Sequence, residues 1–315
     1  MRALRIVFMG TPHFAVGVLQ TIIENGHKVV GIITAPDKPA GRGRKLRQSA
    51  VKEYALSQGL PVLQPTNLKA PEFLDELKAL EANLQVVVAF RMLPKVVWDL
   101  PEFGTFNLHA SLLPEYRGAA PINWAVINAE QETGVTTFFI DEKIDTGAII
   151  ASEKVAIDPR ETAGSLHDKL METGSQLVVH TLDMIANDKA TPQPQDKNLE
   201  FKEAPKLTSE NTQIDWSLSL ESIDAFIRGL SPYPSAWAVL INKDKEMKVK
   251  IYGSEIEPES HSHTLGSIFT EKRKLKVAVE GGYLHITEMQ IPGKRKMDIG
   301  DLLNGFEVEK GAYFS

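Results

Sequence analysis

Short apolar runs and amphipathic stretches alternate along the first half of the chain. Ile6–Met9 is a continuous apolar run of strand length, and the apolar residues between Phe14 and Ile22 recur at the spacing of one helix face. Between these two elements, Thr11 is the predicted N-cap and Pro12 the first helical residue. Further strands are predicted at Val29–Thr34, Leu84–Phe90, Thr105–His109, Thr136–Ile140 and Ala148–Ile157, and further helices at Val51–Gln58, Pro71–Leu80, Ala119–Asn128 and Ser165–Ile185. Continuous apolar strands separated by helices indicate a mostly parallel sheet covered on both faces, so we predict an α/β domain.

The pattern changes in the second half of the chain. Asp188–Glu210 is polar, carries three prolines and has no sustained periodicity, which is typical of a linker. Beyond it we predict a helix at Leu220–Arg228 and short strands at Ala236–Ile241, Met247–Tyr252, Lys274–Val279 and Tyr283–Met289. Short strands separated by turns indicate a small β-barrel or sandwich. Because 315 residues exceed what one core usually serves, we predict domains at 1–189 and 209–315, joined by a linker at 190–208.

Composition narrows the possible chemistry. The net charge is -6, so any nucleic-acid binding must rest on local basic patches. The chain contains no cysteine, which excludes disulfides, a thiolate nucleophile and cysteine-ligated metal. The first apolar run stops at Gly10, too short for a signal peptide or a membrane span. We therefore expect a cytoplasmic protein with no membrane partner.

Two polar residues alternate at the end of the predicted strand Thr105–His109. Alternate residues of a strand point to the same face, so Asn107 and His109 are expected to project together. Open α/β sheets bind ligands beyond the carboxyl ends of their strands. An ordinary hydrogen-bonded pair at a strand end would show the same two residues, so the neighbouring segments decide between the two interpretations.

Those neighbouring segments favour a functional site. Gly118 and small residues precede a predicted helix, where backbone can approach a ligand closely and N–H groups are free. Asp145 lies on a loop between two predicted strands, followed by Thr146 and Gly147. It is a plausible turn residue, and as a functional residue it could orient the His109 ring and keep it charged.

Together these motifs resemble the folate-dependent formyltransferases, and among them the members that act on methionine carried by initiator tRNA. The resemblance covers nearly the whole chain. It rests on the segments Gly10–Ala15, Pro36–Gly43, Asn107–His109, Ser111–Pro114, Arg117–Ile122 and Asp145–Gly147. Two segments depart from the family pattern. Arg91-Met92 stands where bacterial members often have Tyr-Gly, and Ser231–Pro234 where Asn-Pro-Trp-Pro is common. The first departure concerns the lining of the folate pocket.

The resemblance implies a Rossmann-like formyltransferase domain followed by a smaller, OB-like β-barrel that binds tRNA, in a protein that acts as a monomer. It implies that an amine attacks the formyl carbon of 10-formyltetrahydrofolate directly, without a metal or a covalent enzyme intermediate. His109 and the Asn107 amide would then hydrogen-bond to the oxyanion, and Asp145 would support His109 in acid–base chemistry. The resemblance also assigns folate binding to Ser111, Leu112, Leu113 and Pro114.

Basic residues point to an RNA-linked amine. One glycine-containing loop after the second strand carries Lys38, Arg42, Arg44, Lys45 and Arg47, and such charges suit a phosphate backbone. In the family a similar loop enters the acceptor end of initiator tRNA, which implies Arg42 as a tRNA contact. Three further basic clusters lie in the predicted barrel: Lys243, Lys245, Lys248 and Lys250; Lys272, Arg273, Lys274 and Lys276; and Lys294, Arg295 and Lys296.

Three alternatives stay open at this point. A formyltransferase for a small amine, such as a nucleotide-linked amino sugar, would not need the basic loop or the barrel. A dinucleotide-dependent oxidoreductase would be expected to carry G-x-G-x-x-G after the first strand, where this chain has Gly10-Thr11-Pro12. A non-catalytic RNA-binding protein would leave Asn107, His109 and Asp145 without a role.

Overall fold

The computed structural model describes residues 2–40, 45–196 and 200–315, which form two compact units. The first unit comprises Met1–Gly118, Glu132–Ala156 and His167–Glu203. The second comprises Ala119–Gln131, Ile157–Leu166 and Ala204–Ser315. The short strands β8 (Arg117–Gly118) and β11 (Glu203–Ala204) lie where the chain passes from one unit to the other. The domain boundaries at 189 and 209 stay a prediction.

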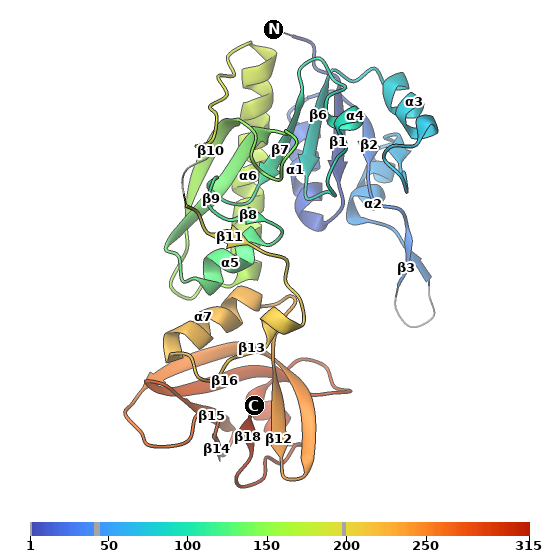
Figure 1. Cartoon of the computed structure of the whole chain (residues 1–315). Helices are drawn as coiled ribbons and strands as arrows, with labels where there is room; N and C mark the ends of the chain where they lie inside the picture. Colours follow the sequence, from blue (N-terminus) through green and yellow to red (C-terminus); the bar gives the residue numbers. More distant parts are fainter. Residues whose placement is uncertain (1, 41–44, 197–199) are drawn as a thin grey trace. The chain divides into compact units, whose positions relative to one another are not determined.

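The first unit is built on a seven-stranded sheet in the order β10-β9-β7-β6-β1-β2-β5 (Figure 1). Its strands are β1 (Ile6–Gly10), β2 (Val29–Ile33), β5 (Val62–Leu63), β6 (Leu84–Val88), β7 (Thr105–His109), β9 (Glu132–Phe139) and β10 (Ile149–Ala156). β1, β2, β5, β6 and β7 are parallel, whereas β9 runs antiparallel to β7 and to β10. The expected Rossmann-like, mostly parallel sheet is therefore confirmed.

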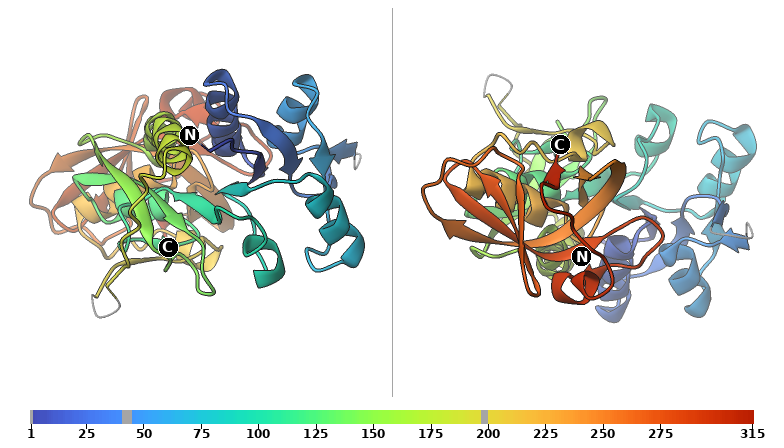
Figure 2. Two further views of the ribbon diagram at one scale, coloured as in Figure 1. Left: turned by 90° about the horizontal axis from the view of Figure 1, so that it is seen from above. Right: turned by 90° about the horizontal axis from the view of Figure 1, so that it is seen from below.

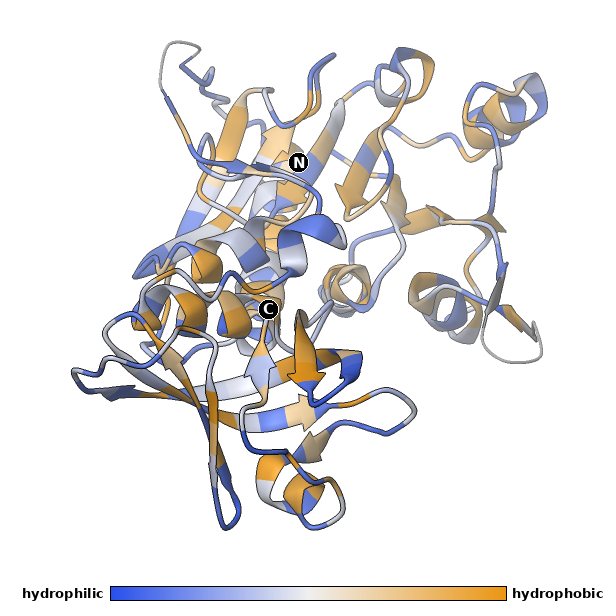
Figure 3. Cartoon of the chain, turned by 60° about the horizontal axis from the view of Figure 1, so that its bottom comes forward, coloured by the Kyte–Doolittle hydropathy of each residue, from blue (hydrophilic) through white to orange (hydrophobic). Residues whose placement is uncertain are grey.

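Helices cover both faces of this sheet. The helices of this unit are α1 (His13–Glu24), α2 (Ala50–Ser57), α3 (Pro71–Ala79), α4 (Lys95–Trp98) and α6 (Ala163–Ala186), whose first residues belong to the second unit. The left view of Figure 2 shows α1, α2 and α6 on one side and α3 and α4 on the other. Strands β1 and β6 are buried along their whole length, which explains their continuous apolar sequences. Figure 3 shows hydrophobic residues concentrated on such strands and hydrophilic residues on the loops.

Two local expectations need correction. The first is the start of α1: Pro12 is the N-cap and no side chain caps the helix, so Thr11 does not play that role. The second is the basic loop after β2. Lys38–Ala40 (β3) and Lys45–Arg47 (β4) pair as an antiparallel hairpin, with Lys38 opposite Arg47. Neither hairpin strand is apolar enough for its sequence to indicate a strand.

The second unit contains a seven-stranded antiparallel sheet, in which six strands follow the order β14-β15-β16-β13-β12-β18 and β17 pairs with β16. Its elements are α5 (Pro121–Ile127), a 3₁₀ turn (Glu210–Thr212), α7 (Leu220–Leu230), β12 (Ala236–Asn242), β13 (Lys245–Pro258), β14 (Ile268–Glu271), β15 (Lys274–Val279), β16 (Gly282–Gln290), β17 (Met297–Asp298), α8 (Ile299–Leu303) and β18 (Tyr313–Phe314). Phe314 N donates to Gly266 O at 2.9 Å and Ile268 N to Ala312 O at 3.1 Å. These bonds bring the two edges of the sheet together, so the expected small barrel is confirmed as a nearly closed one.

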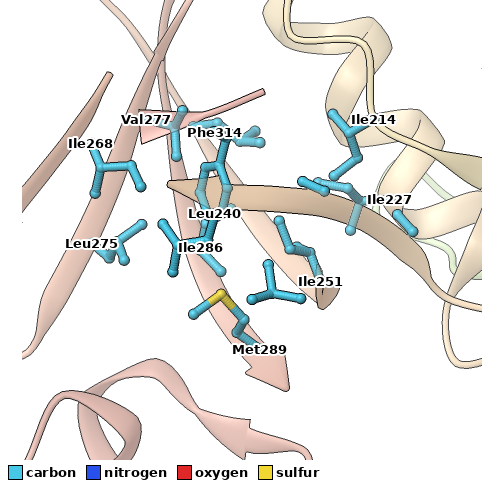
Figure 4. Close-up of a cluster of buried hydrophobic side chains, with 14 of the residues drawn as sticks. Ile214, Ile227, Leu240, Ile251, Ile268, Leu275, Val277, Ile286, Met289 and Phe314 are labelled. Carbon is cyan, nitrogen blue, oxygen red and sulfur yellow. The ribbon is translucent and has the colours of Figure 1, made fainter. Parts of the chain in front are cut away.

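The barrel interior is filled by one apolar cluster. Leu240 of β12 and Ile286 and Met289 of β16 are almost completely buried and lie close together inside the barrel (Figure 4). Trp216 and Phe314 stack beside them, with ring centroids 4.9 Å apart. Removal of this much aliphatic and aromatic surface from water is the main source of the barrel's stability.

A buried charge cluster joins α7 to the barrel wall. The Asp224 carboxylate accepts hydrogen bonds from Arg160 Nη1 at 2.7 Å, Arg228 Nε at 2.8 Å and Ser254 Oγ at 2.8 Å. Arg160 also donates to Ser254 O, and Arg228 to Glu161 O. The Asp224 side chain is only 5% exposed, so its charge depends on these partners.

An exposed ion pair gives the barrel a predicted acid dependence. Hydrogen bonds from Lys276 and then His285 lower the pKa of Glu257 from 4.5 to about 2. A lowered pKa in the folded state stabilises the fold above pH 4.5, and this contribution is lost as the pH falls from 4.5 toward 2. The effect is expected to be small, because 37% of the Glu257 side chain is exposed.

Thermal unfolding of Glu257→Gln would measure it. Its midpoint should lie below that of the unmodified chain at about pH 7, and the gap should narrow as the pH falls below 4.5 and close only below a pH of about 2. The exposed Glu255→Gln is the matched control and should show no such pH-dependent gap. A gap that persists in acid would contradict the assignment.

None of the helices within the described ranges is both long and apolar enough to cross a membrane.

Candidate functional site

The site is organised by β7, in the middle of the first unit's sheet. Asn107 pairs with Val87 of the parallel strand β6, and His109 pairs with Thr136 of the antiparallel strand β9. Paired residues project to the same face, and Val87 belongs to the apolar cluster under α3 and α4. Asn107 and His109 therefore share the α3–α4 face of the sheet, as their spacing predicted.

A backbone carbonyl close in sequence holds the His109 ring in place. Its Nε2 atom lies 2.8 Å from Tyr116 O, so Nε2 carries the hydrogen and donates it to this carbonyl. The Tyr116 carbonyl is presented by a tight turn, in which Tyr116 has a φ of 58°. With Nε2 occupied, Nδ1 is the ring nitrogen that remains available for chemistry.

Asp145 reaches that nitrogen from another part of the chain. Asp145 Oδ2 lies 3.7 Å from His109 Nδ1, within ion-pair range but beyond a hydrogen bond. The same carboxylate oxygen accepts a hydrogen bond from Gly118 N at 3.0 Å. The two side chains are 7% and 13% exposed, so their mutual attraction is only weakly screened by water.

The loop that carries Asp145 folds back along the sheet. β9 is antiparallel to β7 and ends beside the start of β7, where Ile140 N donates to Thr105 O at 2.8 Å. The loop after β9 nevertheless brings Asp145 to His109 at the other end of β7. Gly147 allows this path, because a Cβ at this position would lie 1.6 Å from Phe139 O.

The side-chain amide of Asn107 is available to a ligand. Its side chain is half-buried, and it forms no hydrogen bond to another side chain or backbone group within residues 2–40, 45–196 and 200–315. An amide of this kind, next to His109 on one face, can donate to a ligand oxygen without first breaking a protein hydrogen bond. The three predicted catalytic side chains are thus gathered at one end of β7.

The predicted folate segment forms a braced turn directly after β7. Ser111 Oγ donates to Glu115 O at 2.5 Å, and Thr136 Oγ1 donates to Ser111 O at 2.7 Å. Leu113 N in turn donates to Thr136 Oγ1 at 3.2 Å. The Ser111 hydroxyl is buried and already donates its hydrogen bond to Glu115 O. This turn can therefore offer a ligand only backbone atoms and the half-exposed side chains of Leu112 and Pro114.

The predicted tRNA residues lie on the β3–β4 hairpin. Lys38 is exposed on β3, and the backbone of Lys45 belongs to β4. Arg42 and Arg44 lie outside the described residues. At the base of the hairpin, Asp37 accepts hydrogen bonds from Gln64 and Lys52, and these bonds lower the pKa of its carboxyl.

The unusual pair Arg91-Met92 follows β6 at the same edge of the sheet. Arg91 donates to the carbonyls of Thr66 and Pro65, and Met92 is 67% exposed. Arg91 is therefore fixed by backbone, which leaves Met92 as the adaptable residue of this segment.

Sequence reasoning missed one residue of this neighbourhood, Gln195. It lies in the segment interpreted as a linker, and its side chain contacts the Asp145 loop. No periodicity marks it, and only its position in a proline-rich segment that follows a long helix distinguishes it.

Comparison with known proteins shows the family to which the chain belongs. The chain matches the formyl transferase family over residues 4–182 and the formyl transferase C-terminal domain family over residues 206–307. It is 58% identical to the methionyl-tRNA formyltransferase of Flavobacterium johnsoniae, with 97% of each chain covered. It is 56% identical to that of Flavobacterium psychrophilum, with 99% of each covered. Among solved structures, the sugar 3N-formyl transferase WlaRD, determined with dTDP and 5-N-formyl-THF, is similar in fold. Its TM-score is 0.65 at 20% identity, over 94% of this chain and 100% of that one. The gathered Asn107, His109 and Asp145 thus lie in a chain that belongs to the formyl transferase family.

Proposed function

We propose that this protein transfers the formyl group of 10-formyltetrahydrofolate to the α-amino group of methionine on initiator tRNA, giving N-formylmethionyl-tRNA for translation initiation. The formyl transfer is supported above all by the approach of Asp145 to His109 Nδ1, at 3.7 Å, on the strand that also carries Asn107. The acceptor is supported by the full-length similarity to relatives named methionyl-tRNA formyltransferase.

The reaction needs a site for a developing oxyanion. When the amine lone pair attacks the formyl carbon, the carbonyl π pair moves onto oxygen. The amide of Asn107 and a protonated His109 Nδ1 would donate hydrogen bonds to that oxygen. One such donor is typically worth roughly 10²–10³ in rate, because it is aimed before the charge forms.

The reaction also moves a proton. The attacking nitrogen loses a proton, and the folate nitrogen takes one as its bond to the formyl carbon breaks. His109 can serve both steps through Nδ1, since Nε2 is fixed on Tyr116 O. The nearby Asp145 carboxylate stabilises the imidazolium form between them.

The braced turn Ser111–Pro114 is proposed to receive the formyl donor. It begins two residues after His109 and is rigid by virtue of its bonds to Glu115 and Thr136. A rigid backbone next to the catalytic residues is suited to hold a reacting group within bond-forming distance.

For the RNA part of the acceptor, we propose the β3–β4 hairpin with Lys38, Arg42, Arg44 and Lys45, together with one face of the barrel. On that face Lys248 Nζ lies 3.4 Å from the ring centroid of Trp237, and Tyr233 is 82% exposed. Among the residues described, neither Lys248 nor Lys250 forms a direct ion pair with a carboxylate, although Lys248 attracts the Glu210 carboxylate from a longer distance. In the other two basic clusters, Arg273, Lys276 and Lys296 are paired with Asp301, Glu257 and Glu288. We assign the phosphate contact to the β12–β13 face, where Lys248 and Lys250 alternate along β13 and so point to the same side.

We further propose that the enzyme acts as a monomer in the cytoplasm. In this proposal a catalytic domain at 1–189 and a tRNA-binding domain at 209–315 are joined by a linker at 190–208.

The second candidate acceptor is a small amine such as a nucleotide-linked amino sugar.

Acceptor choice would be tested by mixing the protein with 10-formyltetrahydrofolate and following folate absorbance. Charged initiator Met-tRNA should start turnover, whereas nucleotide-linked amino sugars and uncharged tRNA should not. Turnover with an amino sugar and none with Met-tRNA would overturn the acceptor assignment.

Binding of tRNA is expected to weaken steeply with salt. Six phosphate contacts, from the four hairpin cations and from Lys248 and Lys250, predict a rise in Kd of roughly 10³-fold between about 50 and 200 mM salt. Lys250→Ala should lower the slope of log Kd against log salt by about 1, because it removes one phosphate contact. Lys296→Ala, whose ammonium is already paired with Glu288, is the control and should change the slope less. A Kd insensitive to salt would contradict the proposed contacts.

A further inference from the structure

The segment after α6 returns along the first unit instead of leaving it. Gln193 and Ile149 exchange backbone hydrogen bonds, each at 2.8 Å, which adds this segment to the edge of β10. Two residues later, Gln195 is only 8% exposed. A buried glutamine in a polar, proline-rich stretch needs hydrogen-bond partners to offset its desolvation.

Two of those partners are backbone carbonyls in the loop that carries Asp145. Its Nε2 donates to Asp145 O at 3.0 Å and to Gly147 O at 2.8 Å. Its Oε1 accepts from Arg117 Nη2 at 2.5 Å. The Gln195 side-chain amide therefore links the backbone carbonyls of Asp145 and Gly147 to the guanidinium group of Arg117.

Arg117 is itself fixed in place. Its guanidinium carbon lies 4.5 Å from the ring centroid of Phe201, and its Nε is buried with no hydrogen-bond partner in the described part of the chain. Because Arg117 stacks on a ring and donates to Gln195, it orients the glutamine so that Nε2 faces the loop carbonyls. The next residue, Gly118, donates directly to the Asp145 carboxylate.

The loop needs such support because its conformation is unfavourable. Asp145 has a φ of 55°, a left-handed conformation that non-glycine residues adopt at a cost. The path past Gly147 leaves no room for a Cβ. The loop has internal bonds from Thr146 and Lys143 to Asp141, but these do not tie it to β7.

We propose that Gln195 is a positioning residue for catalysis: with Arg117, it holds the backbone of Asp145 so that the carboxylate stays within reach of His109. This inference rests on the proposed catalytic role of Asp145. It gives the segment between α6 and β11 a part in the reaction itself, besides connecting the two units.

Single-turnover formylation of Met-tRNA by Gln195→Leu tests the proposal. The rate at saturating substrate should fall about 10- to 100-fold, since small misplacements of catalytic groups have effects of this size. The KM for 10-formyltetrahydrofolate should stay within about twofold, because the Ser111–Pro114 turn is untouched. Gln193→Ala, an exposed side chain two residues away, is the matched control and should keep its rate. Gln195→Glu is the second variant, nearly identical in shape but unable to donate to the two carbonyls when ionised, and it should be slow as well.

A double-mutant cycle separates this inference from the function on which it rests. In an Asp145→Ala background, Gln195→Leu should cause no further loss of rate, because the group it positions is gone. If Asp145→Ala is slow but both Gln195 variants are fast, only the positioning role is overturned. A lower thermal midpoint with an unchanged rate would also overturn it, as the mark of a purely structural residue. If Asp145→Ala itself is fast, the catalytic assignment and this inference are overturned together.

Discussion

His109→Ala is expected to slow single-turnover formylation of Met-tRNA by about 10³-fold or more while the protein stays folded. The variant loses an oxyanion donor and the proton carrier together, and each is typically worth at least about 10² in rate. The lost bond to Tyr116 O is a local contact between residues close in sequence. Folding should therefore be affected much less than catalysis.

Asp145→Asn is expected to lose about 10²-fold or more by the same measurement. Its amide is similar in size to the carboxylate and can still face Gly118, but it carries no charge to stabilise an imidazolium. His180→Ala, which removes an exposed imidazole from α6, is the matched control and should keep its full rate. Both catalytic variants should retain the circular dichroism of the unmodified chain.

A near-normal rate for His109→Ala or for Asp145→Asn would remove that residue from the mechanism. The reaction would then have to rely on Asn107 and on the precise placement of the two substrates. Rapid quench of the formyl-tRNA product is the direct readout, because steady-state rates can be limited by product release.

Asp224→Ala is expected to destabilise the second unit by about 3–5 kcal/mol. The substitution leaves the Arg160 and Arg228 guanidinium groups beside a site that has lost its carboxylate, and Arg228 is only 13% exposed. A buried cation that has lost its partner has a large desolvation cost. This cost arises in the folded state and not in the unfolded chain, so the free energy of unfolding falls.

Urea denaturation followed by tryptophan fluorescence would measure this loss. Trp124, Trp216 and Trp237 belong to the second unit, so the signal reports mainly on it. Asp301→Ala is the matched control: its partner Arg273 lies at 2.6 Å, but both side chains are more than 60% exposed. It should cost less than about 1 kcal/mol. Equal losses from the two substitutions would show that burial does not set the strength of the Asp224 cluster.

Helices and strands with strong periodicity could be predicted from sequence because their patterns are local. β7 begins and ends where the pattern places it, at Thr105 and His109, and α3 differs from its prediction by one residue. The shortest elements carry no such pattern. β18, with two residues, exists because Tyr313 and Phe314 complete the barrel, and β3 and β4, with three residues each, pair with one another as a separate hairpin.

The same division holds at the candidate site. Sequence alone determined the residue types, the strand that carries Asn107 and His109, and their common face, because alternation along a strand is a local property. Only the tertiary structure decided that Asp145 folds back over the sheet to reach His109, and that Gln195 holds it there. These contacts join residues 36 and 50 positions apart, and such distances are set by the packing of the whole sheet and its loops.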